Sequence, residues 1–211
     1  LVAFRIPNFF RRLFAEGAFS QAFLPILAET KANENDIEVQ LVINHIATKL
    51  LSVLMIITLI AVVAAPLVIF IFAWGFYFKA DSTQFNLASD MLRLTFPYLL
   101  LISLTALSGS ILNAFDNFTV PAFTPVLLNI SLILSAVFLS QFLNNPIMAL
   151  AWGVLIGGIL QLAFQIPFLR KIKKLPKLQF GHHKTIDTLK KRMLPALFGV
   201  SVSQINLLVD T

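Results

Sequence analysis

Between residues 117 and 169 the chain reads NFTVPAFTPVLLNISLILSAVFLSQFLNNPIMALAWGVLIGGILQLAFQIPFL and contains no Asp, Glu, Lys or Arg. A helix that crosses the roughly 30 Å hydrocarbon core of a bilayer needs about 20 largely apolar residues. This stretch is long enough for two such helices, and the polar turn Asn144, Asn145 and Pro146 divides it between them. The stretch therefore predicts two membrane-spanning helices joined by a short loop.

The rest of the chain extends the same pattern. Residues 50–78 and 94–115 carry no charged side chain, and 193–209 is a further apolar run. Hydrophobic residues make up 58% of the 211, only 12% are charged and the mean hydropathy is +0.85, which excludes an ordinary water-soluble domain. We predict an all-α integral membrane protein, a polytopic helical bundle. Its expected helices lie near 1–28 (broken), 39–78, 86–113, 119–143, 147–172 and 186–211.

Basic residues set the predicted orientation. Residues 170–192, RKIKKLPKLQFGHHKTIDTLKKR, carry nine Lys or Arg and one Asp, so the positive-inside rule makes this loop cytoplasmic. Because consecutive spans alternate sides, loops 29–38 and 113–121 share that face. The loop is either a pure topology signal or a surface that attracts anionic lipid headgroups. Without interleaved aromatics or a known module, it does not favour nucleic-acid binding.

The sequence offers no catalytic or metal-binding constellation. Cysteine is absent, which excludes disulfides and thiolate metal sites. The three histidines, His45, His182 and His183, are too scattered for a zinc or haem site. There is no GxSxG, HExxH or Walker loop. We therefore predict no catalytic residues and no metal.

The opening residues 1–29 are atypical because they place charges among Phe, Leu and Ile. These charges are Arg5, Arg11, Arg12, Glu16 and Glu29. A charge at bilayer depth costs at least about 2.5–3.5 kcal/mol, so such residues usually face a cavity or a partner. On a continuous helix Arg5 and Arg12 share a face, and Glu16 lies one turn beyond Arg12. Two interpretations stand: a juxtamembrane Arg pair with Glu16 as its partner, or guanidinium groups that bind a pyrophosphate bidentately.

Four stretches resemble one family, in the same order along the chain. FRIPNFFRRLFAEGAFSQAFLPILAE (4–29) resembles the signature of the MurJ/MviN family, the bacterial lipid II flippases of the MOP exporter superfamily. Three further stretches are similar to the same family: LTFPYLLLISLTALSGSILNAFDNFTVPAFTPVLLNIS (94–131), MALAWGVLIGGILQL (148–162) and LPALFGVSVSQINLLVD (194–210). Members have about fourteen transmembrane helices, and this chain resembles the second to the seventh. It begins without Met and ends at Thr211 without a cap, so we expect the N-terminal part of a larger transporter.

The resemblance implies transport of lipid II, the undecaprenyl-pyrophosphate-linked peptidoglycan precursor, across the bacterial inner membrane by alternating access. It implies that Arg11 and Arg12 match an arginine pair lining a cationic cavity, and that Glu16 matches the acidic residue of the motif. It also places Asp210 where some members bind sodium. No cofactor is implied, the energy source being sodium or the membrane potential, and the other half of the cavity lies in helices outside this chain.

Two other classes of function remain open from the residues alone. One is another MOP exporter, which moves drugs or a different polyprenyl-linked glycan; the FAEGAF motif and the Arg pair (Arg11 and Arg12) distinguish the flippases from it. The other is a membrane-embedded enzyme or accessory subunit acting on polyprenyl phosphates, which needs carboxylates or histidines clustered at one membrane face.

Overall fold

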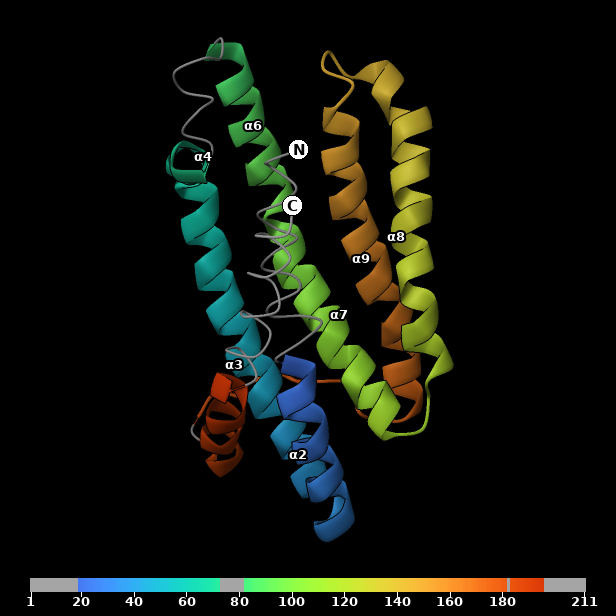
Figure 1. Cartoon of the computed structure of the whole chain (residues 1–211). Helices are drawn as coiled ribbons and strands as arrows, with labels where there is room; N and C mark the ends of the chain where they lie inside the picture. The colour runs from blue at the N-terminus through green and yellow to red at the C-terminus, as the bar shows by residue number, and fades with distance from the viewer. Residues whose placement is uncertain (1–18, 73–81, 182, 196–211) are drawn as a thin grey trace.

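The computed structural model describes residues 19–72, 82–181 and 183–195 (Figure 1). Within these ranges every regular element is a helix, as expected for an all-α protein. The α-helices are α2 (Phe19–Asn33), α3 (Asp36–Val63), α4 (Ala65–Phe72), α6 (Ser82–Thr95), α7 (Pro97–Ala114), α8 (Thr119–Val137) and α9 (Met148–Lys171). A short 3-10 helix, η2 (Leu139–Phe142), follows α8, and a last helical stretch covers 184–195.

Four described helices are long and apolar enough to cross a membrane, which confirms a multi-pass membrane protein. They are Asp36–Val63, Phe85–Ala114, Thr119–Val137 and Met148–Lys171. Large apolar side chains on the outer face of α8, among them Ile133, Leu134 and Val137, are at least half exposed, as suits contact with lipid. The expected helices 1–28 and 186–211 fall partly outside the described residues.

Helix ends and breaks differ from the predicted bounds for local reasons. The expected helix 39–78 is interrupted at Ala64, just before Pro66, and the expected helix 86–113 is interrupted at Phe96, just before Pro97. Proline lacks the backbone N–H that would continue the ladder, and its ring crowds the preceding turn. The predicted loop 29–38 is shorter than expected, because α2 continues to Asn33 and α3 begins at Asp36.

Side chains explain two of these ends. Asn35 caps α3 by accepting a hydrogen bond from the Glu38 backbone N–H at 2.9 Å. The expected helix 119–143 changes to 3-10 geometry after Val137. There the side chains of Ser140 and Gln141 donate to the carbonyls of Ala136 and Val137, in competition with the α-helical ladder.

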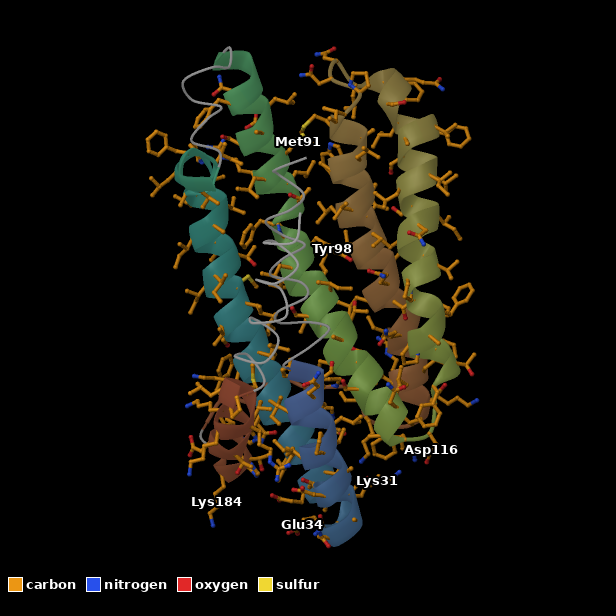
Figure 2. The ribbon with its side chains drawn as sticks, viewed as in Figure 1. Lys31, Glu34, Met91, Tyr98, Asp116 and Lys184 are labelled. Atoms are coloured by element: carbon orange, nitrogen blue, oxygen red, sulfur yellow. The ribbon has the colours of Figure 1, made fainter. Side chains whose placement is uncertain are left out.

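The helices form a bundle with two sides joined by α7 (Figure 1). The hairpin α8–α9 lies on one side, with α9 packed against α7. The α3 helix packs on the other side of α7, and α4 packs against α6 at one end of the bundle. At the opposite end, α2 contacts both α3 and α7. Lys31, Asp116 and Lys184 all lie toward this second end, whereas Met91 lies far from it (Figure 2).

Small residues allow α8 and α9 to pack closely. A Cβ added to Gly153 would lie 2.9 Å from the Ser135 Cβ, and one added to Gly157 would lie 3.3 Å from the Leu128 Cα. The Ser131 hydroxyl donates to the Gly153 carbonyl at 2.8 Å across this contact. Close backbone approach with a hydroxyl bond between helices is the common packing mode inside membranes, so these positions are structural.

Candidate functional site

The residues predicted to bind substrate and cation, Arg11, Arg12, Glu16 and Asp210, lie outside the described residues. The described chain begins at Phe19, on the same predicted helix as the Arg pair. Phe19, Phe23 and Leu27 are fully buried and anchor one face of α2 in the bundle core.

A cavity of about 240 Å³ lies between α2, α7, α8 and α9. Among the described residues that line it, none is Asp, Glu, Lys or Arg, and seven are polar and uncharged: Ser20, Thr105, Ser110, Asn113, Thr124, Gln161 and Gln165. Between helices that otherwise present apolar side chains, so many polar groups require hydrogen-bond partners. The described part of the cavity wall is thus uncharged, with these polar side chains set in a mostly apolar surface.

Two glutamines of α9 form a fixed network in the wall of this cavity. The Gln161 Nε2 donates to the Thr124 carbonyl at 3.1 Å, and the Gln165 Nε2 donates to the Thr124 hydroxyl at 3.1 Å. Thr124 in turn donates to the Val120 carbonyl at 3.0 Å. Both glutamine side chains are at least 98% buried, and neither Oε1 has a hydrogen-bond partner among the described residues. The network leaves two buried amide oxygens as acceptors.

The second polar region is at the end of the bundle that holds the three predicted cytoplasmic loops. Lys31 of α2 donates to the Ala114 carbonyl at 2.8 Å and lies 3.7 Å from Asp116, in the loop after α7. Arg192 contacts Glu29 through two hydrogen bonds of 3.0 and 3.1 Å. The loops predicted to share one face therefore meet at one end of the bundle.

Residues 172–181, which we term the linker segment, dock on α3. The Asn44 Oδ1 accepts from the Lys177 backbone N–H at 2.9 Å, and the Thr48 hydroxyl accepts from the Gln179 backbone N–H at 2.8 Å. The Gln40 Nε2 donates to the Leu175 carbonyl at 3.1 Å. The predicted basic loop 170–192 is thus held against the bundle by side chains of α3.

Ion pairs reinforce this docking. Lys174 is buried and contacts both the carboxylate and the carbonyl of Asp36. His183 lies 3.0 Å from the Glu38 carboxylate, and its ring centroid is 5.1 Å from that of His45. Among the described residues, no group of three or more His, Cys, Asp or Glu is arranged to hold a metal. These contacts hold the linker segment and the nearby His183 against α3.

Replacing Asp36 with alanine is expected to lower the free energy of unfolding by about 2–3 kcal/mol. The Lys174 ammonium would remain buried without a carboxylate, and removing one partner of a buried pair costs about 3–5 kcal/mol. The Asp36 side chain is 83% exposed, which reduces the effect. Thermal unfolding of the full-length protein measures it.

Two controls separate this effect from general damage. Lys174→Met combined with Asp36→Ala is expected to restore most of the loss, because the buried charge is gone. Asp90→Ala removes a carboxylate from an exposed pair with Arg93 and is expected to change stability by less than about 1 kcal/mol. Equal losses for Asp36→Ala and Asp90→Ala would contradict the assignment.

The sequence predictions do not include the glutamine network of α9 or the docking of the linker segment on α3, although the spacing of their polar residues indicates both. Gln40, Asn44 and Thr48 are spaced four apart on α3, and Gln161 and Gln165 are spaced four apart on α9. Polar side chains four apart share a helix face, and inside an apolar helix they mark an interface or a cavity.

These observations first define a class: a polytopic α-helical membrane protein with a cavity between four of its helices. A family model described as "Lipid II flippase MurJ" matches residues 1–211. The chain therefore belongs to the MurJ lipid II flippase family, as the resemblance implied.

Relatives and a solved structure agree with this assignment. A "Probable lipid II flippase MurJ" from Haemophilus influenzae is 45% identical over 100% of this chain and 42% of that protein. A "Lipid II flippase MurJ" from Burkholderia cenocepacia is 41% identical over 100% of this chain and 41% of that protein. A solved structure, "Lipid II flippase MurJ, inward closed conformation", matches with a TM-score of 0.76 and 29% identity over 99% of this chain and 42% of that chain. The chain thus spans about two fifths of the length of these relatives.

Proposed function

We propose that this chain is part of a lipid II flippase, which moves the undecaprenyl-pyrophosphate-linked peptidoglycan precursor from the inner to the outer leaflet of the bacterial inner membrane. The observation that carries the proposal is the family match over all 211 residues. Because the chain spans 42% of its Haemophilus influenzae relative, the remaining helices of the same transporter complete the substrate site.

Within this chain, the proposed substrate contacts are Arg11 and Arg12, with Glu16 one helical turn beyond Arg12. Guanidinium groups remain charged at physiological pH and bind phosphate oxygens bidentately, which suits a pyrophosphate held inside a membrane. The buried face of α2 supports this assignment, since it anchors the following part of the same predicted helix in the bundle.

The proposed cycle is alternating access. The pyrophosphate headgroup enters the site from the cytoplasmic side while the polyprenyl tail stays in lipid, and movement of two helix bundles then opens the site to the outside. A difference in affinity between the two states must drive the change. Sodium bound at Asp210, or the membrane potential, is proposed to supply that difference, with no organic cofactor.

Depletion of the full-length protein in its host tests the function. We expect lipid II to accumulate on the cytoplasmic leaflet, measured by its access to a reagent confined to the outer face. Re-expression of the wild-type protein is the control and should restore outer-leaflet lipid II. An unchanged leaflet distribution after depletion would overturn the proposal.

A further inference from the structure

The linker segment carries two large apolar side chains that the bundle leaves exposed. Leu178 is 67% exposed and Phe180 is 79% exposed. Scattered apolar side chains are common on protein surfaces, so exposure alone does not identify a partner. Their depth relative to the bilayer determines what they contact.

The hydrogen bonds to α3 fix that depth, because they advance regularly along the helix. The bonded pairs are Leu175 with Gln40, Lys177 with Asn44, and Gln179 with Thr48. Two residues of extended chain span about 6.6 Å and four helical residues rise about 6 Å, so the two repeats match. The linker segment therefore runs along α3, away from the contact of Lys174 with Asp36 and toward the apolar part of the helix.

The last of these bonds lies at the edge of the apolar part of α3. The uncharged run from Leu50 to the end of α4 at Phe72 rises about 34 Å, close to the roughly 30 Å thickness of the hydrocarbon core. Thr48 precedes Leu50 by roughly 3 Å of helix, and the polar headgroup layer on each side of the core is about 5–7 Å thick. The two exposed apolar side chains flank the residue bonded to Thr48, so they lie at the level of the headgroups.

The charges near these side chains suit a lipid surface. Residues 172–181 contain no Asp or Glu, and Lys49 and Lys177 are exposed. Lysine stems can follow an apolar surface while the ammonium group reaches lipid phosphates, and anionic headgroups attract such groups. Apolar side chains beside lysines are typical of segments that lie in a membrane interface.

We propose that Leu178 and Phe180 insert into the headgroup layer of the leaflet at this end of the bundle, the predicted cytoplasmic leaflet. The linker segment is then held by the lipid surface on one side and by α3 on the other. The proposal goes beyond the flippase function and requires only the membrane-spanning bundle.

Site-directed nitroxide labels measure the depth in the full-length protein, reconstituted in liposomes of phosphatidylethanolamine and phosphatidylglycerol. The labels are attached to Leu178→Cys or Phe180→Cys, each as the sole cysteine; residues 1–211 contain no other. The measured quantity is the accessibility to molecular oxygen, which concentrates in the bilayer, divided by the accessibility to a water-soluble nickel chelate.

Two exposed isoleucines provide matched controls. Ile37 is 73% exposed but precedes Leu50 by roughly 20 Å of helix, so Ile37→Cys reports an apolar position in water. Ile133 is 62% exposed on the outer face of α8, so Ile133→Cys reports a position in lipid.

We expect the oxygen-to-nickel ratio at Leu178 and at Phe180 to be several-fold higher than at Ile37 and to approach that at Ile133. Exposed positions tolerate substitution, and thermal unfolding checks that each labelled protein folds. A ratio equal to that at Ile37 would place the linker segment in water and overturn the proposal. Protection from both reagents would overturn it too, because other helices of the protein would then cover these side chains. Loss of the flippase assignment would leave the expected ratios unchanged.

Discussion

Replacing Arg11 or Arg12 with alanine in the full-length transporter is expected to abolish transport while the protein still folds. Removing one partner of a desolvated, hydrogen-bonded charge pair costs about 2–5 kcal/mol of binding free energy, a loss of more than about thirtyfold in affinity. The pyrophosphate charge would then lie in the membrane without compensation. Growth of a strain that depends on the variant, together with outer-leaflet lipid II, measures the effect.

Matched variants make this result specific. Arg12→Lys keeps the charge but loses the bidentate geometry, so we expect partial activity. Arg93→Ala removes an arginine from an exposed pair with Asp90 and should support normal growth. Normal growth of a strain that depends on Arg11→Ala or Arg12→Ala would refute the assignment.

The spans of this bundle are predictable from sequence because the bilayer imposes a minimum apolar length. The uncharged run 117–169 predicts the α8–α9 hairpin, and its polar turn at Asn144 and Asn145 falls between the helices. The apolar length does not determine where a helix breaks. Pro125 and Pro167 lie inside continuous helices, whereas Pro66 and Pro97 follow interruptions. Packing around each proline determines whether the helix breaks there, and the neighbouring residues in the sequence do not reveal that packing.

Charged residues give the clearest sequence signal for a candidate site. Arginines within an apolar segment are conspicuous, so the residues alone draw attention to Arg5, Arg11 and Arg12, and the family resemblance then selects Arg11 and Arg12. Neutral polar residues such as Gln161 and Asn44 are less conspicuous: their spacing indicates an interface or a cavity, but their partners lie far along the chain. The hydrogen bonds between the linker segment and α3 join residues 131 to 135 positions apart. Counting charges in 170–192 therefore predicts its side of the membrane but not its docking on α3.

Asn44→Ala is expected to release the linker segment from α3 and to lower the free energy of unfolding by about 3 kcal/mol. Asn44 is 6% exposed, and its Oδ1 accepts from the Lys177 backbone N–H at 2.9 Å and from the Gln40 Nε2 at 2.8 Å. Its Nδ2 donates to the Gln179 Oε1 at 3.1 Å. Three hydrogen bonds at about 1 kcal/mol each give the estimate.

Hydrogen exchange distinguishes release of the linker segment from a general loss of stability. In Asn44→Ala the amide of Lys177 should exchange faster, since local opening exposes it while the amides of α9 remain protected. Thr48→Val removes only the bond to the Gln179 amide and should cost about 1 kcal/mol, whereas Thr48→Ser keeps the acceptor and should cost less. This order follows from the number of hydrogen bonds lost. If Asn44→Ala left the exchange of the Lys177 amide unchanged, the docking of the linker segment would not depend on these hydrogen bonds.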